Sequence, residues 1–178
     1  MCEQVDDRFL LDAARDGDLD AFAMLVRRHQ VAVYRVALRM LASEAEAQDA
    51  TQETFVRAWR GLRRFRGDSA VSTWLYRIVT RRCLDLIAMR RPAADLEQTD
   101  LPAHDDPAKT AEERDRLRAV TRAIAALPGD QRAALVLREF EGLSYDQIAE
   151  VMHTSVAAVK GRIHRARLAV LTGTTAWR

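Results

Sequence analysis

The chain has 178 residues, of which 48% are hydrophobic, 30% charged and 6% aromatic, which permits one ordinary globular domain or two small ones. This composition excludes collagen, low-complexity disorder and a coiled-coil rod. No apolar run approaches the roughly 18 residues that a membrane-spanning helix needs, and the acidic start MCEQVDDRFL is unlike a signal peptide. We therefore expect a soluble, cytoplasmic protein.

The cysteines and histidines indicate neither disulfides nor a metal site. Only two cysteines occur, Cys2 and Cys83, and the first lies at a terminus, so we expect no disulfide framework. The four histidines lack ligand spacing such as HxxxH, and no CxxC pair accompanies them. The sequence therefore predicts no metal and no cofactor.

The net charge of +2 conceals an uneven distribution of charge along the chain. Residues 1–91 carry 16 basic and 13 acidic side chains, residues 92–113 carry one and seven, and residues 114–178 carry 11 and six. Within the first segment, ten arginines gather in residues 57–91. Such local concentration of basic charge is what a surface that faces nucleic acid requires.

The spacing of apolar residues predicts an all-α chain in two small domains. Glycine and proline are sparse, at seven and four, and apolar residues recur mostly at intervals of three and four. Three of the prolines fall within residues 92–112, where no period is sustained, so this segment reads as a flexible acidic linker. The domains are then expected at 1–91 and 113–178.

In the first domain the apolar pattern predicts helices over about residues 9–14, 22–41, 44–62 and 74–91. Ser43 followed by Glu46 forms a capping-box pattern at the start of the third helix, and Pro92 ends the fourth. The loop FRGDSAVS separates these two helices.

In the second domain, one predicted helix carries an apolar stripe of Leu117, Val120, Ile124 and Leu127. Pro128-Gly129 ends it, and the next helix closes at Gly142. Ser144 with Gln147 supplies a capping box for the helix SYDQIAEVM, and the turn HTS leads into VAAVKGRIHRARLAVL. Two helices joined by so short a turn predict a helix-turn-helix.

The last predicted helix has a basic face. Four cations lie within eight residues, from Lys160 to Arg167, and no acid follows Glu150. Lysine and arginine in such positions neutralise phosphates, and arginine can also bond a guanine edge in the major groove. The alternative is a solvated basic helix end that complements the helix dipole.

A second segment, LRRFRGDSAVSTWLYRIVTRRC, interleaves arginines with Phe65, Trp74 and Tyr76. This mixture suits single-stranded nucleic acid, because cations follow the backbone while ring faces hold exposed bases. The loop GDS could bond a base turned out of the stack. Alternatively the aromatic rings are core, and the helical spacing of Trp74 with Ile78 favours that for Trp74.

The third segment is EAEAQDATQETFVRAW. Asp49, Gln52 and Glu53 share one helical face, opposite the apolar face that contains Phe55 and Trp59. Taken alone, acids near the amino end of a helix usually only complement its dipole.

Together these segments resemble the extracytoplasmic-function (ECF) group of bacterial sigma factors, the smallest members of the sigma-70 family. The resemblance covers nearly the whole chain and is carried, in the family's order, by DATQETFVRAW, FRGDSAVSTWLYRIV, LPGDQRAALVLREFEGLSYDQIAEVM and VKGRIHRAR. It implies sigma-2 and sigma-4 domains, the latter with the helix-turn-helix. It also implies a promoter-specificity subunit that binds core RNA polymerase and promotes strand opening, with no enzymatic activity.

The resemblance implies a role for three surfaces. The β′-binding face, for the clamp of the polymerase β′ subunit, comprises Asp49, Gln52 and Glu53. The −10 surface, which captures, reads and melts the −10 element, comprises Phe65, Arg66, Gly67, Asp68, Ser69, Trp74, Tyr76, Arg77 and Arg81. The recognition surface, for the −35 element, comprises Lys160, Gly161, Arg162, His164, Arg165 and Arg167.

The implied partners are core RNA polymerase, through its β′ clamp and β subunits, promoter DNA and an anti-sigma factor, with no small-molecule substrate. The acidic linker resembles the segment threaded near the polymerase active centre and the RNA exit path. Several positions depart from the family pattern and put the promoter sequence and the detailed polymerase contact in question: Gln48, Arg81, His153, Ala157 and Gly161.

Two other classes of protein remain as alternatives. A helix-turn-helix regulator acting without polymerase would bind duplex promoter DNA by itself and would have no use for FRGDSAVSTWLYR. A helical enzyme would use Asp49, Glu53 and a histidine as acid–base groups or as part of a metal carboxylate site, but no second motif converges with them.

Overall fold

The structure is a computed structural model that describes residues 6–65, 67–90 and 110–175. Within these ranges it contains helices and no strand, which confirms the all-α prediction. The helices are α1 (Asp7–Arg15), α2 (Leu19–Leu41), α3 (Glu44–Gly61), α4 (Val71–Met89), α5 (Ala111–Ala125), α6 (Gly129–Glu139), α7 (Tyr145–Met152) and α8 (Val156–Thr175), with a 3₁₀ turn at Leu62–Arg64. Arg66 and residues 92–109 of the expected linker lie outside the described residues.

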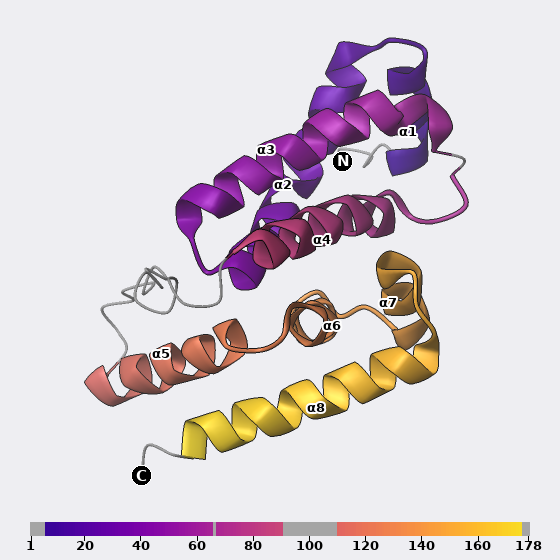
Figure 1. Cartoon of the computed structure of the whole chain (residues 1–178). Helices are drawn as coiled ribbons and strands as arrows, with labels where there is room; N and C mark the ends of the chain where they lie inside the picture. Colours follow the sequence, from indigo (N-terminus) through magenta and orange to yellow (C-terminus); the bar gives the residue numbers. More distant parts are fainter. Residues whose placement is uncertain (1–5, 66, 91–109, 176–178) are drawn as a thin grey trace.

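The helices form two groups that lie one above the other in Figure 1. In the first group, α2 packs against α1, α3 and α4, and its inward side carries Val33, Val36 and Met40, all fully buried. In the second group, α8 packs against α5, α6 and α7. No described helix is both long and apolar enough to cross a membrane.

Side-chain caps explain where several helices begin. The Asp18 carboxylate accepts hydrogen bonds from two main-chain N–H groups at the start of α2. The capping box predicted from Ser144 and Gln147 is present at α7, and a further one joins Thr110 and Glu113 at α5. These contacts satisfy N–H groups that have no partner within the helix.

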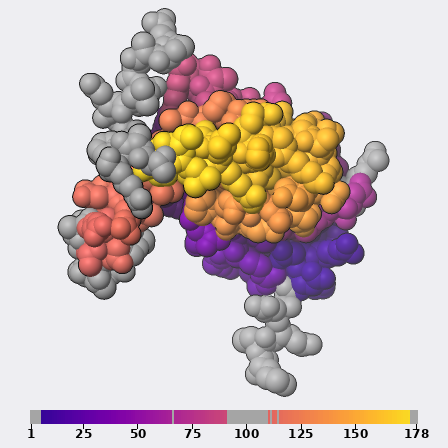
Figure 2. Space-filling view, turned by 90° about the horizontal axis from the view of Figure 1, so that it is seen from below, coloured from indigo at the N-terminus to yellow at the C-terminus, as the bar shows by residue number. Residues whose placement is uncertain are grey.

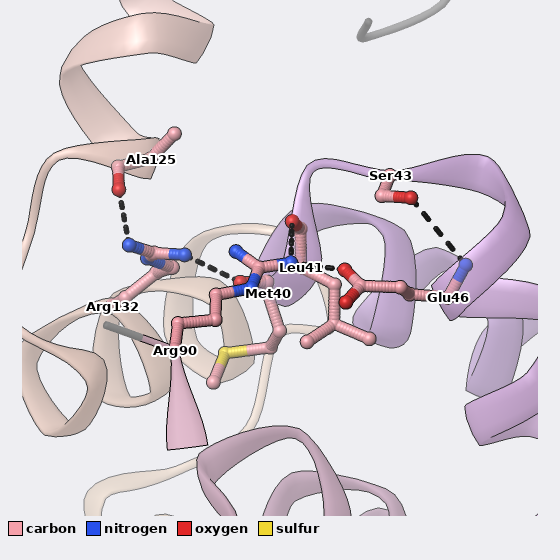
Figure 3. Close-up of polar contacts among 7 residues, drawn as sticks. All are labelled: Met40, Leu41, Ser43, Glu46, Arg90, Ala125 and Arg132. Atoms are coloured by element: carbon pink, nitrogen blue, oxygen red, sulfur yellow. Dashed lines mark hydrogen bonds and ion pairs between the residues drawn. The ribbon is translucent and has the colours of Figure 1, made fainter. Parts of the chain in front are cut away.

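The capping box predicted at α3 forms only in part. The Ser43 hydroxyl accepts a hydrogen bond from the main-chain N–H of Glu46, as expected. The Glu46 carboxylate, however, pairs with Arg90 at the end of α4 and does not turn back to the cap (Figure 3). Tertiary packing brings Arg90 close to Glu46, and the ion pair replaces the hydrogen bond that the capping box would have made. No local pattern in the sequence could reveal this.

The apolar stripe predicted on α5 is only half buried. Ile124 and Leu127 are buried, but Leu117 and Val120 are 46% and 37% exposed. The exposed Phe140 and α8 side chains such as Leu171 lie near the buried end, around an apolar hollow of about 370 Å³. The amphipathic pattern of α5 therefore does not end in a closed core.

The carboxyl end of α2 joins the two groups of helices. The Arg132 guanidinium, from α6, donates hydrogen bonds to the main-chain oxygens of Met40 (2.5 Å), Leu127 (3.0 Å) and Ala125 (Figure 3). Arg90 donates to the oxygen of Leu41 (2.9 Å). These donors reach carbonyl groups that a helix leaves unpaired at its carboxyl end, where its dipole favours cations.

Candidate nucleic-acid interface

The helix-turn-helix of the second domain is built on a tight turn. Ile148 of α7 and Val159 and Ile163 of α8 are buried in one hydrophobic cluster. His153 ends α7 with φ 49° and ψ 51°, in the left-handed region where a glycine would be easier to accommodate. The turn thus keeps a geometry that favours glycine even though the sequence places histidine there.

The recognition surface lies on α8, which crosses the middle of the face shown in Figure 2. Lys160, His164 and Arg165 are exposed on it, with His164 one turn after Lys160 and Arg165 next to His164. Gly161 is half-buried, and a Cβ atom there would meet the Arg165 guanidinium at 3.4 Å. A side chain at position 161 would therefore contact the mobile end of the Arg165 side chain without a clash.

Two cations of the recognition surface are held by acids of α6. Arg162 pairs with Asp130 at 2.9 Å, and Arg167 pairs with Glu139 at 2.5 Å. The hydrogen bond to Glu139 raises the pKa of Arg167, so its charge is secure. These ion pairs orient both guanidinium groups, and neither pair could be foreseen from helical spacing.

The β′-binding face belongs to α3, a helix that α4 separates from the second domain in Figure 1. Asp49 and Gln52 are exposed there. Glu53 is partly exposed and pairs with Arg57 and with Arg82 of α4, both at 2.5 Å. The three predicted residues therefore share one accessible face, as their spacing indicated.

The loop between the 3₁₀ turn and α4 borders a hollow. The rings of Phe65 and Trp74 stack with centroids 4.5 Å apart and planes inclined by 16°. Gly67 has φ 79°, which suits glycine, and lies with Phe65 and Ser69 around a cavity of about 610 Å³. Asp68 is exposed beside it. Arg66, also assigned to this surface, lies outside the described residues.

The other wall of this cavity was not expected from the sequence. It is formed by the first turn of α1, from Asp6 to Arg8, and by Arg28 of α2. The Asp7 carboxylate pairs with Arg28 and lies 2.7 Å from Nε2 of His29, which ties α1 to α2. An acid in a first helical turn ordinarily indicates only a dipole complement, so nothing in the sequence pointed to this contact.

The α4 residues of the −10 surface point in different directions. Arg81 is exposed and pairs with Asp85 of the same helix. Trp74 is partly buried and packs against the core, as its spacing with Ile78 favoured. Tyr76, by contrast, is only 8% exposed, and Arg77 pairs with an acid of the second domain. The structure therefore does not gather these side chains on one open surface.

The described residues contain no group of three or more histidine, cysteine or acidic side chains that could hold a metal ion. Cys83 is a buried thiol, and burial raises its pKa to about 12. The site is thus a set of polar and aromatic surfaces on two helical domains, the second a helix-turn-helix. This arrangement defines a two-domain helical protein with basic nucleic-acid-facing elements.

Comparison with known families makes the identity definite. The family model "Sigma-70 region 2" matches residues 25–92, and "Sigma-70, region 4" matches residues 117–170. The RNA polymerase sigma-H factor of Pseudomonas aeruginosa is 41% identical, with 96% of this chain and 94% of that protein covered. The ECF RNA polymerase sigma-E factor of Haemophilus influenzae is 38% identical, with 94% of each covered. The chain belongs to the sigma-70 family and, within it, to the ECF sigma factors.

Solved structures show the same fold. The structure of CnrH in complex with the cytosolic domain of CnrY matches with a TM-score of 0.74 and 32% identity, covering 97% of this chain and 99% of that one. The sigma factor RpoE of Bartonella quintana, in complex with the anti-sigma factor NepR, matches with a TM-score of 0.70 and 21% identity, covering 90% and 100%. The resemblance found in the sequence is confirmed, and the chain is a transcription initiation factor that works with RNA polymerase.

Proposed function

We propose that the chain divides promoter recognition among the three surfaces defined above. The β′-binding face on α3 docks the factor on core polymerase, the −10 surface captures and melts the downstream element, and the recognition surface on α8 reads the −35 element. Residues 1–91 and 113–178 act as separate domains, joined by the linker at 92–112. The chain has no covalent chemistry of its own and acts in the cytoplasm, where the polymerase works.

The observation that carries this proposal is the cavity beside the Phe65–Trp74 stack. It is a hollow of about 610 Å³, large enough for a nucleobase, and Phe65 and the short loop residues Gly67 and Ser69 line it. A base turned out of duplex DNA needs such a pocket to offset the lost stacking. A simple helix-turn-helix regulator has no use for it, so this cavity favours a factor that opens DNA.

The accessible face of α8 supports −35 reading. Lys160 and Arg165 are exposed, and both can reach base edges if α8 enters the major groove. Arg162 and Arg167 are oriented by acids of α6, which suits contacts that position the domain on phosphates.

Regulation by an anti-sigma factor is part of the proposal. One solved structure described above contains a sigma factor bound to an anti-sigma factor, and the other contains CnrH bound to the cytosolic domain of CnrY. The match to CnrH covers both helical domains of this chain. A partner that holds the two domains together would keep the factor from polymerase.

The proposal is tested by run-off transcription with core polymerase over a library of genomic fragments. It predicts transcripts that start at a fixed distance from a shared pair of sequence elements, and only when the factor is present. Transcription that does not depend on the factor, or start sites without shared elements, would contradict it. The same experiment gives the promoter sequence, which the departures at Arg81, His153 and Gly161 leave undetermined.

A further inference from the structure

The −10 surface of α4 is in contact with acids of the second domain. The Tyr76 hydroxyl donates a hydrogen bond to Oε2 of Glu141 at 2.9 Å. The Arg77 guanidinium donates to Oε1 of Glu150, on α7, at 2.6 Å. Contacts between α4 and α7 are prominent among those that join the two domains. Both side chains that would face DNA are thus engaged by carboxylates of the same chain.

Glu141 is buried between the two domains, where it contacts Tyr76 of α4 and Arg35 of α2. Its side chain is only 3% exposed, and the oxygen that accepts from Tyr76 also lies 3.3 Å from Arg35 of α2. Its other oxygen, Oε1, is buried and has no hydrogen-bond partner among the described residues. A buried carboxylate oxygen without a hydrogen-bond partner raises the free energy of the closed arrangement. Opening the domains would let water hydrate this oxygen, so the contact can be broken at little cost.

A second contact holds the domains together from the other side. Arg132 is 5% exposed, and its guanidinium donates hydrogen bonds to main-chain oxygens, including that of Met40, 92 residues away. Burial, followed by the nearby charge of Arg90, lowers its pKa to about 10. Close by, a Cβ atom at Gly129 would lie 3.1 Å from Leu84 and 3.4 Å from Ile87 of α4. The domains are therefore tightly apposed along α4.

The closure does not cover the other two surfaces. In Figure 1, α4 lies between α3 and the second domain, whereas α3 and α8 lie on opposite outer sides. Asp49 and Gln52 on α3 and Lys160 on α8 stay exposed. The contact between the domains thus engages Tyr76 and Arg77 of the −10 surface and leaves the other two surfaces accessible.

We propose that the chain inhibits itself through this contact, with Glu141 and Glu150 standing where DNA phosphates and base edges would otherwise meet Tyr76 and Arg77. The inference rests on the proposed −10 role of α4. Tyr76 is only 8% exposed under the second domain, and the Glu150 carboxylate places a negative charge beside Arg77 that would repel DNA phosphates. The domains must therefore separate before DNA reaches these two side chains. DNA or polymerase that binds only the open form shifts the population toward it.

The first test removes the carboxylate charges. Glu141→Gln with Glu150→Gln is compared with Asp146→Asn, which removes one charge from an exposed position of α7. Spin labels on exposed side chains at Val56 and Leu168 report the distance between the domains in the free protein. We expect the double variant to shift toward longer distances and the control to match the unmodified chain.

The second readout is binding of the free chain to a fluorescent single-stranded oligonucleotide, the non-template −10 strand of a promoter found by run-off transcription. We expect the double variant to bind about tenfold more tightly, the effect of losing roughly one charge-assisted contact from the closed form. Asp146→Asn should change binding less than twofold. Equal affinities for the double variant and the unmodified chain would overturn the proposal.

A third test holds the domains closed with an engineered disulfide that can be reduced. Ile87→Cys with Gly129→Cys, in a Cys2→Ser and Cys83→Ala background, places two thiols where the closed domains meet. The oxidised chain should lose −10 oligonucleotide binding, and reduction should restore it. Oligonucleotide binding that survives oxidation, with the disulfide verified by mass spectrometry, would overturn the self-inhibition.

One further comparison separates this inference from the proposed function. Tyr76→Ala with Arg77→Ala is added to the opened double variant. If opening the domains raises oligonucleotide affinity and the two alanine substitutions abolish that increase, both the self-inhibition and the −10 role of Tyr76 and Arg77 are supported. A gain that is insensitive to the alanines keeps the closure but removes the −10 role of the two side chains, whereas separation of the labels without any gain contradicts the self-inhibition itself.

Discussion

Phe65 lies flat against Trp74, with ring centroids 4.5 Å apart. Trp74 packs in turn against the core of the first domain, so the stack fixes the start of the loop that leads to Gly67 and Ser69. Aromatic pairs of this kind add about 0.5–1.5 kcal/mol beyond the area that they bury. The loop is therefore anchored at one end, beside the cavity that Phe65, Gly67 and Ser69 line.

The β′-binding face should be required for polymerase binding and dispensable for folding. Asp49→Arg with Glu53→Arg reverses two charges on the exposed side of α3, where surface ion pairs contribute only about 0–1 kcal/mol to stability. We expect the variant to lose co-purification with core polymerase while its circular dichroism spectrum stays helical. Glu44→Arg, at an exposed position of the first turn of α3, is the control and should co-purify. Unchanged co-purification of the double variant would refute the assignment.

Recognition of the −35 element should separate into base reading and phosphate contact. Lys160→Ala and Arg165→Ala should each weaken binding by about 1–3 kcal/mol and relax sequence preference at one position. Arg167→Ala should weaken all sequences about equally and reduce the slope of log K against log salt by roughly one. Binding to a panel of −35 variants at several salt concentrations measures both. Arg116→Ala, on exposed α5, serves as the control. Full sequence preference in the Lys160 and Arg165 variants would exclude α8 as the reader.

Among the described residues, two that are not glycine have a positive φ, and replacing one of them by glycine should stabilise the protein. Ala42 has φ 55° at the end of α2. Because an L-residue in this region costs roughly 1–2 kcal/mol and glycine's extra freedom in the unfolded chain offsets part of that, Ala42→Gly should raise the free energy of unfolding by about 0.5–1 kcal/mol. Ala169→Gly, in the exposed interior of α8, should lower it by about 1 kcal/mol. Urea unfolding measures both, and a destabilised Ala42→Gly would contradict the geometry of the α2 end.

The buried thiol of Cys83 should make stability fall at alkaline pH. Burial, far more than the surrounding charges, raises its pKa to about 12, from 9.0 in its ordinary state. The folded chain therefore holds this proton more tightly than the unfolded chain, so the contribution is complete below pH 9 and is lost as the pH rises toward 12. The free energy of unfolding of the Cys83→Ala variant should fall less steeply over that pH range. Urea unfolding at several pH values measures it. In a Cys2→Ser background, a thiol reagent at pH 8 should label Cys83 only after unfolding.

Much of the fold could be predicted because its determinants are local. The helix start at Ser144, the positive φ at Gly142 and the helix-turn-helix of α7 and α8 all follow from short sequence patterns. Family recognition rested on the same kind of pattern, since the matching segments are contiguous. Local patterns were still read incompletely, since the caps at Asp18 and at Thr110 with Glu113 are equally local and were not predicted.

The remaining features depend on which distant groups meet. Arg132 bonds the oxygen of Met40 across 92 positions, and Tyr76 meets Glu141 across 65. The sequence does not distinguish an arginine exposed to solvent from one buried between domains, because both occupy positions outside the apolar stripe of a helix. The pairing of Arg167 with Glu139 and the exposure of Leu117 were missed for the same reason.

The central claim, that the loop beside the Phe65–Trp74 stack opens promoter DNA, is tested most directly by permanganate footprinting. The variant carries Arg66→Ala, Asp68→Ala and Ser69→Ala and is assembled with core polymerase on linear promoter DNA. Each stacking step lost on opening is worth about 1.4 kcal/mol on average, and stacking of a base on an aromatic group returns about 1–3 kcal/mol. We therefore predict that the variant binds polymerase normally, shows no reactive thymines on duplex DNA and regains part of its transcription on a pre-melted bubble template. Normal permanganate reactivity of the variant on linear duplex DNA would contradict the account.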